Sequence, residues 1–347
     1  MTLRSPVPGT GPPGPYHRYV KLPTDHPHPF VRRLFSFWAP TERSMRGWAM
    51  ASVVVNAGIT VTGAGVRVTG SGLGCPTWPR CTPDSFIPVA HPEVSPLNMA
   101  VEFGNRLLTF LVLAVGVACV LSALRMTPRR RSLVLLAWLQ PVGIVAQALW
   151  GGLVVNTMLN PFTVGMHFLI SSGLIAACWV LYARAGEGDG PARRVTHRDI
   201  RRLGHVLLAA VFVLLVAGVV VSGTGPHSGD AMASRFDLDI EIVARVHADI
   251  AYVVVGLTFA LAFALHVNNA PRPARRAALV LFAVELAQGV IGYTQYFLAV
   301  PAMLVLLHVL GSTLVWIAAL RVVTSLRTRA PETAPAGPSP TAAHAAV

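Results

Sequence analysis

The chain has 347 residues, of which 53% are hydrophobic and only 12% are charged, and its mean hydropathy is +0.57. Soluble domains carry about 25% charged residues, so the composition excludes an ordinary soluble protein. The net charge of +13 does not indicate a nucleic-acid partner, because the arginines concentrate between apolar stretches, as they do in membrane proteins.

Eight apolar stretches alternate with polar segments along the chain. Each is about 20 residues long, which is enough to cross a hydrocarbon core of about 30 Å as a helix. They predict membrane spans at Trp48–Val66, Met99–Leu124, Leu133–Val155, Thr163–Ala183, Leu203–Ser222, Ala244–Leu265, Ala277–Leu298 and Met303–Val323. Residues 1–45 lack the apolar core of a signal peptide and are predicted to be a polar tail. Residues 326–347, rich in Pro, Ala and Thr, are predicted to be a disordered tail.

The arginines predict the orientation of these spans. Heavy arginine clusters follow the second, fourth and sixth spans and flank both ends of the spanning region, whereas the other connections carry only Arg67, Arg80 and Arg235. By the positive-inside rule, both tails lie in the cytoplasm and the odd connections lie outside the cell membrane. The first outer loop, about 67–98, is the longest.

An internal repeat relates the two halves of the chain. A shift of 141 residues lays the third and fourth spans on the seventh and eighth without a gap, matching Ala146-Gln147 with Ala287-Gln288, Gly151 with Gly292, His167 with His308 and Ser171 with Ser312. A shift of 160 matches Gly58, Val61, Gly63 and Gly65 with Gly218, Val221, Gly223 and Gly225. Because each half holds an even number of spans, the repeat is parallel. The sequence therefore predicts an all-α membrane protein of eight transmembrane helices, built as two four-helix bundles at 46–185 and 203–325 joined by a cytoplasmic linker, 186–202.

Three of the twelve histidines lie inside apolar spans, near the predicted outer face. They are His167, His247 and His308, on the fourth, sixth and eighth spans. Ionisable groups at that depth are costly and usually functional, and neutral imidazole is a common axial ligand of haem iron. Hydrogen bonding between helices, worth about 1 kcal/mol, is the structural alternative. The three together favour haem ligation, with His247 and His308 as a facing pair.

A carboxylate and an arginine lie four residues apart at the start of the second span. Glu102 is expensive next to hydrocarbon unless it is paired or used, so it is either bonded to Arg106 or functional. Glu241 and Arg245 repeat the spacing before His247. Both arginines are also plausible partners of haem propionates, which bind cations in bidentate fashion.

The first outer loop contains two cysteines, Cys75 and Cys81, separated by five residues. In an oxidising compartment they can close a small disulfide, and the alternative is a redox-active thiol pair. Cys119 and Cys178 lie deep in spans and are predicted to be packing residues.

These features together resemble one family, haem A synthase, over residues 46–325. The resemblance rests on the duplicated eight-span plan, the Gly-Leu-Gly-Cys75-Pro-x-Trp-Pro loop, the Glu102-x-x-x-Arg106 motif and the three histidines. It implies a membrane oxidoreductase that converts the C8 methyl group of haem O into a formyl group by two successive oxidations, giving haem A for cytochrome oxidase. The Arg-, Ala- and Val-rich composition resembles actinobacterial members.

The resemblance also implies that the two bundles bind different haems. Haem B is the expected cofactor of the C-terminal bundle, with His247 and His308 as iron ligands and Arg245 beside them. The substrate haem is expected in the N-terminal bundle. Its expected contacts are His167, as an iron ligand, with Asn105 and Arg106, and Glu102 is the expected catalytic residue.

One position departs from the family pattern. Family members commonly have a histidine directly before the arginine of the second span, where this chain has Asn105. The departure puts bis-histidine binding of the substrate in doubt. Two other functions compete with the synthase: a b-type cytochrome for membrane electron transfer, and a haem or small-molecule permease. Pathway logic adds haem O synthase, the protohaem farnesyltransferase, as a partner beside membrane lipid, and homo-oligomerisation stays open.

Overall fold

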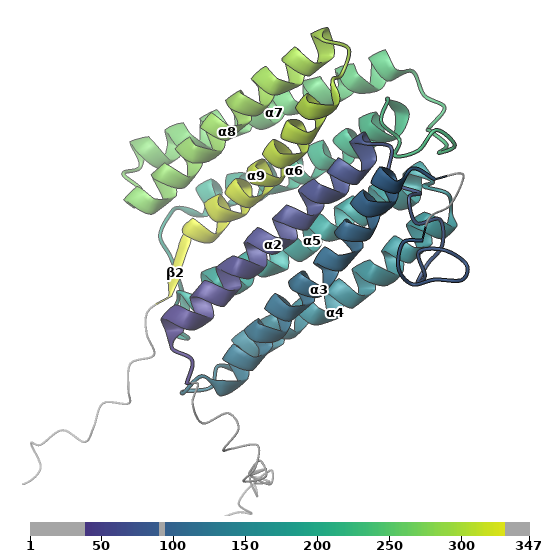
Figure 1. Cartoon of the computed structure of the whole chain (residues 1–347). Helices are drawn as coiled ribbons and strands as arrows, with labels where there is room; N and C mark the ends of the chain where they lie inside the picture. The colour runs from purple at the N-terminus through teal and green to yellow at the C-terminus, as the bar shows by residue number, and fades with distance from the viewer. Residues whose placement is uncertain (1–38, 90–93, 330–347) are drawn as a thin grey trace, which may run out of the picture. The chain divides into compact units, whose positions relative to one another are not determined.

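The computed structural model describes residues 39–89 and 94–329. Its eight long helices are each apolar and long enough to cross a membrane, so the chain is a multi-pass membrane protein and the predicted all-α fold is confirmed (Figure 1). They are α2 (Glu42–Val68), α3 (Pro96–Arg125), α4 (Arg131–Asn156), α5 (Pro161–Ala185), α6 (Arg198–Thr224), α7 (Ile240–Val267), α8 (Arg272–Phe297) and α9 (Ala302–Ser325). The helices are longer than the predicted spans because polar residues continue them at their ends. For example, α2 begins at Glu42, and Thr41 caps it by accepting a hydrogen bond from the Ser44 amide.

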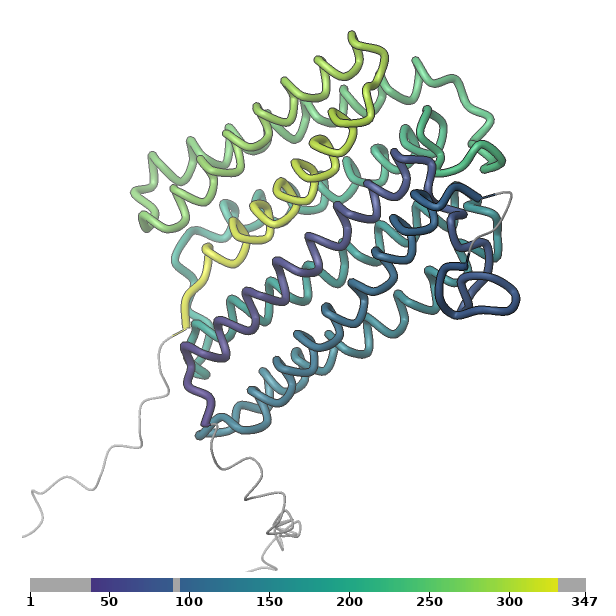
Figure 2. Tube along the Cα trace, viewed as in Figure 1, coloured from purple at the N-terminus to yellow at the C-terminus, as the bar shows by residue number. Residues whose placement is uncertain are grey.

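The helices form two rings of four in which each helix contacts the next and the last contacts the first (Figure 2). One ring holds α2 to α5 and the other α6 to α9. The Gln147 side chain donates to the carbonyl of His167 at 3.0 Å, and Gln288 donates to the carbonyl of His308 at 2.6 Å. The same hydrogen bond at matching positions is what a parallel duplication predicts.

The two ends of the bundles need names. The connections after α2, α4, α6 and α8 lie at one end, called here the disulfide end because it holds Cys75 and Cys81. The connections after α3, α5 and α7 lie at the opposite end, called the arginine end.

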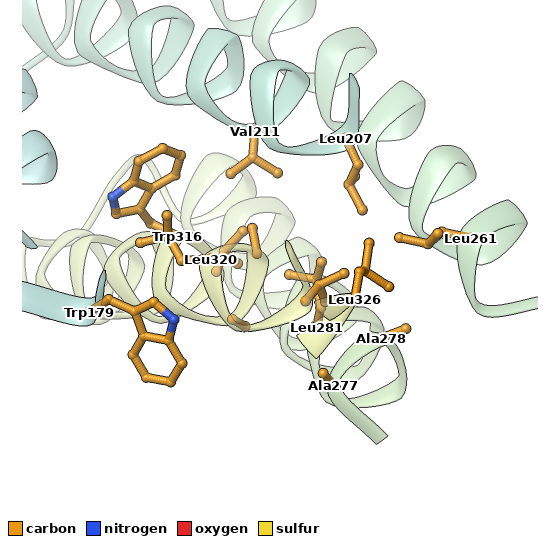
Figure 3. Close-up of a cluster of buried hydrophobic side chains, with 14 of the residues drawn as sticks. Trp179, Leu207, Val211, Leu261, Ala277, Ala278, Leu281, Trp316, Leu320 and Leu326 are labelled. Atoms are coloured by element: carbon orange, nitrogen blue, oxygen red, sulfur yellow. The ribbon is translucent and has the colours of Figure 1, made fainter. Parts of the chain in front are cut away.

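The two bundles pack through α5, which contacts α6 and α9, and through α2, which contacts α9. The largest buried cluster crosses this contact and continues along α9 (Figure 3). Two tryptophans hydrogen-bond across it: Trp316 of α9 donates to the carbonyl of Ser172 at 2.8 Å, and Trp179 of α5 donates to the hydroxyl of Thr324 at 3.2 Å. Buried indoles need such partners, so these two bonds hold the bundles in register.

A two-stranded antiparallel sheet links the segment after α5 to the end of α9. Strand β1 (Ala192–Arg194) lies in the predicted linker and pairs with β2 (Arg327–Arg329). The prediction of a disordered tail from residue 326 is therefore wrong for Arg327–Arg329. Leu326 is 2% exposed, and its burial in the core brings the following residues alongside β1. The rest of that prediction, 330–347, and most of the predicted N-terminal tail lie outside the described residues.

Five charged side chains form an ion-pair cluster at the arginine end, one of them Arg329 of β2, which pairs with Glu187 at 3.7 Å. Arg130 pairs with Asp189 at 2.8 Å, and Arg184 pairs with Asp189 at 3.1 Å and with Glu187 at 3.0 Å. The side chains of Arg130 and Arg184 are each less than 10% exposed. Partial burial alone would raise the pKa of the Asp189 carboxyl, but hydrogen bonding and attraction from the two arginines outweigh it and hold the pKa below its ordinary value.

We expect Asp189→Asn to lower the free energy of unfolding by roughly 1–3 kcal/mol, because it removes the negative charge that pairs with two nearly buried arginines. Since the pKa is depressed on folding, the stabilisation is present above the ordinary carboxyl pKa and is lost as pH falls through the folded value, below about pH 4. Thermal unfolding in detergent between pH 3 and pH 7 measures both effects.

The matched control is Asp199→Asn. Asp199 also pairs with an arginine, Arg202, but both side chains are more than 60% exposed, so the unfolding temperature should barely change. Equal losses in the two variants would contradict a special role of the buried cluster.

Candidate functional site

Three imidazoles lie at a similar depth near the disulfide end. His167 lies soon after the start of α5, His247 soon after the start of α7 and His308 soon after the start of α9. The Nδ1 atom of each is buried and has no hydrogen-bond partner among the described residues. Burying a polar nitrogen without a partner costs free energy. A ligand that binds this nitrogen would remove the cost, so each ring has a free position for a ligand.

His247 and His308 face each other across the second bundle. Their helices, α7 and α9, are diagonal in the ring and do not contact each other, yet the ring centroids lie 6.3 Å apart with planes at 66°. An imidazole nitrogen binds a metal at about 2 Å, so two rings on opposite sides of one metal have centres roughly 6 Å apart. The observed spacing therefore fits one iron between the two rings.

Glycines lie against these rings. A Cβ added to Gly218 of α6 would lie 3.2 Å from Cε1 of His247, and a Cβ added to Gly292 of α8 would lie 3.4 Å from Cε1 of His308. The absence of side chains there lets the flanking helices approach the imidazoles. No group of three His, Cys, Asp or Glu residues within 39–89 and 94–329 could hold a metal ion. A haem needs only two axial ligands from the chain, because its porphyrin supplies the others.

The first bundle repeats half of this arrangement. His167 lies against Gly151 as His308 lies against Gly292, with a hypothetical Cβ 3.6 Å from Cε1. The diagonal helix, α3, presents Asn105, whose side-chain oxygen accepts a hydrogen bond from Thr62 at 2.7 Å. The first bundle therefore offers one imidazole where the second offers two.

Glu102 and Arg106 form the predicted ion pair. One carboxylate oxygen accepts from Nε and Nη2 of Arg106 at 3.1 and 2.6 Å, and the other accepts from the Cys75 amide at 2.6 Å. Arg106 also donates to the carbonyls of Cys75, Thr77 and Arg80 at 2.7, 3.0 and 3.2 Å. All three nitrogens of Arg106 are therefore engaged, and its predicted contact with a haem propionate would compete with these bonds.

The predicted disulfide between Cys75 and Cys81 is present. Both residues are 0% exposed and pack with Met99 of α3. Trp78 of the same loop lies so close to α4 that a Cβ added to Gly152 would meet its ring at 2.5 Å. The loop therefore lies against the disulfide end of α3 and α4, where the disulfide braces the backbone that Glu102 and Arg106 bind.

Glu241 and Arg245 share the spacing of Glu102 and Arg106 but form no ion pair with each other. Both side chains are exposed. Glu241 lies in the first turn of α7, where the helix dipole favours an anion. Arg245 makes no hydrogen bond or ion pair with any residue that the structure describes, so it can bind a ligand anion.

Comparison with known proteins decides the family. The model of the COX15-CtaA family, described as cytochrome oxidase assembly proteins, matches residues 46–320. The chain belongs to this family. It is also 30% identical over 195 residues to the heme A synthase of Azorhizobium caulinodans, a match that takes in 49% of this chain. The chain covers 53% of that relative, about half of its length.

These matches confirm the family resemblance in the sequence. Neither match addresses an actinobacterial origin, which stays a prediction.

The structure of this COX15-CtaA member adds one buried acid that the sequence analysis did not single out. Glu285 of α8 is 6% exposed, and one of its oxygens accepts from the Thr258 hydroxyl of α7 at 2.9 Å. The other oxygen is buried without a partner among the described residues. The sequence does indicate this residue, because Glu285 is a lone carboxylate between Val284 and Leu286 in an apolar stretch. Such groups inside a membrane are usually functional.

Proposed function

We propose that the chain is a haem A synthase, which oxidises the C8 methyl group of haem O to a formyl group and so makes haem A for cytochrome oxidase. The observation that carries the proposal is the asymmetry between the two bundles. Two facing imidazoles suit a permanently bound haem, whereas the single imidazole of His167 suits a haem that must bind and leave. Membership of the family and the similarity to a heme A synthase support the same function.

The second bundle is proposed to hold the cofactor, haem B. His247 and His308 would hold its iron, and Arg245 would bind a propionate. Bound there, haem B supplies one-electron redox chemistry. The side chain of Gln288 donates a hydrogen bond to the carbonyl of His308. This bond helps hold the His308 imidazole level with that of His247.

The first bundle is proposed to hold haem O. His167 would contact its iron, Asn105 would offer its amide group beside it, and Arg106 would lie near the periphery of the substrate. Converting a methyl group into a formyl group adds one oxygen atom; with water as its source, the conversion releases four electrons, for which haem B would be the one-electron carrier, and four protons, so protons must leave the site. Glu102 is the one acidic residue in the disulfide-end half of helices α2 to α5, and we assign it the role of proton acceptor.

The chain is proposed to lie in the cell membrane with both termini in the cytoplasm. The support is the concentration of arginines at the arginine end, and an oxidising compartment at the other end is consistent with the disulfide. Haem O synthase, which would supply the substrate, is the proposed partner.

Pigment extraction tests the proposed function. The full chain is produced in cells that also make haem O, purified in detergent, and its haems are identified by chromatography and mass spectrometry. We expect haem B together with haem O or haem A, and haem A formation that depends on this chain. Haem B alone would indicate a b-type cytochrome, and protein without haem would indicate a permease; either result overturns the proposal.

A further inference from the structure

A groove between α7 and α8 lies at the arginine end of the second bundle. Its volume is about 480 Å³, and most of its surface is apolar. Phe259 of α7 and Phe282 of α8 face each other within it, with ring centroids 6.2 Å apart. Phe263 and Leu279 also line it and are 62% and 59% exposed. The groove is therefore open at the surface, and its floor is apolar and aromatic.

Basic side chains line the same groove, namely His266, Arg272, Arg275 and Arg276. None of the three arginines makes a hydrogen bond or ion pair with any residue within 39–89 or 94–329. They lie at the start of α8, which has no acidic residue in its first turn. The helix dipole disfavours cations at this position, so the chain itself leaves these charges uncompensated.

The internal repeat shows that two of these three charges belong to the second bundle alone, because Arg272 falls on Arg131 of α4. The shift of 141 residues lays Arg275 and Arg276 on Val134 and Leu135 of α4. At the same end of the first bundle, Arg130 is neutralised by Asp189. Arg275 and Arg276 therefore need an explanation beyond the repeated architecture.

We propose that this groove binds one anionic phospholipid, with its phosphate between Arg272, Arg275 and Arg276 and an acyl chain along Phe259 and Phe263. The occupant needs an anionic head joined directly to an apolar tail, because cationic and apolar groups line one continuous groove. Guanidinium groups bind phosphate in bidentate fashion, and basic pockets between transmembrane helices bind anionic lipid headgroups. The proposal does not depend on the enzymatic function.

Lipid titration of the full-length protein tests the site. Protein purified in detergent is titrated with dioleoyl phosphatidylglycerol, and bound lipid is counted by native mass spectrometry. Dioleoyl phosphatidylcholine is the uncharged comparison. We expect one phosphatidylglycerol to bind tightly and the Arg275→Gln/Arg276→Gln variant to bind it roughly thirty-fold more weakly. Phe259→Ala/Phe263→Ala, which keeps the charge, should also weaken binding.

The repeat provides a matched control, Arg129→Gln/Arg131→Gln, which removes the same charge at the same end beside α4. We expect this variant to bind phosphatidylglycerol like the unmodified chain. Equal losses in both arginine variants, or equal binding of phosphatidylcholine, would overturn the proposal. Displacement of the lipid by equimolar inorganic phosphate would instead show a site for free phosphate. Thermal unfolding checks that each variant is folded, and the single variant Arg275→Gln serves if the double variant is not.

Discussion

Replacing His308 by alanine is expected to yield folded protein whose low-spin haem is lost or reduced at least ten-fold. Changes around a metal ligand already cost 10–100-fold in affinity, and this variant removes the ligand itself. The facing ring, 6.3 Å away between centroids, would be left as the lone imidazole. Absorption spectra of the oxidised and reduced protein, with total haem per chain, measure the effect, and His247→Ala should behave alike.

Two further histidine variants make this result specific. His205 is exposed at the arginine end of α6, so His205→Ala should leave the spectrum unchanged. His167→Ala should keep the low-spin haem of the second bundle and lose haem A formation. If His308→Ala instead purifies with an unaltered low-spin spectrum, the cofactor assignment is wrong.

Glu102→Gln is expected to reduce haem A formation by roughly 100-fold or more, the usual loss when an acid–base group is removed. Glutamine keeps an oxygen that can accept from the Cys75 amide, but it cannot take up a proton at neutral pH. The haem of the second bundle should keep its spectrum, because Glu102 lies in the other ring. Haem analysis of cells that make haem O gives the yield.

The ion pair of Glu102 with Arg106 raises a second possibility, that the carboxylate only positions the disulfide loop. Limited proteolysis within the loop and thiol labelling of Cys75 and Cys81 separate the two roles, because a positioning role predicts a loosened loop in Glu102→Gln. Glu102→Asp should restore part of the activity if a proton acceptor is needed. Glu42→Gln, at the arginine end, is the control. Normal haem A yield from Glu102→Gln rules out the catalytic role.

The sequence predicts the eight helices well, because apolar stretches between arginine clusters have few alternatives in a membrane. The matching of His167 with His308 likewise predicts the duplication and the depth of the imidazoles. Periodicity could not show that α7 and α9 lie diagonally, because that depends on which helices contact, and the 6.3 Å spacing of His247 and His308 follows from it.

Other features depend on contacts between distant segments. The spacing of Glu102 and Arg106 predicts an ion pair, but not that the arginine also binds three carbonyls of the disulfide loop. Glu241 and Arg245 have the same spacing, but in the part of the chain that the structure describes no such loop binds Arg245, and the two side chains form no ion pair. The strand Arg327–Arg329 was missed because its order comes from pairing with β1, while its own composition is that of a polar tail.

The contact between α5 and α9 has a consequence for electron tunnelling. These neighbouring helices carry His167 and His308 at similar depth, and the indoles of Trp179 and Trp316 bind them to each other. Two haems held by these histidines would therefore be attached to neighbouring helices that two hydrogen bonds join. Electron passage between them would then not require the two bundles to move, and its rate would depend on the distance between the haems as well as on the difference in their reduction potentials.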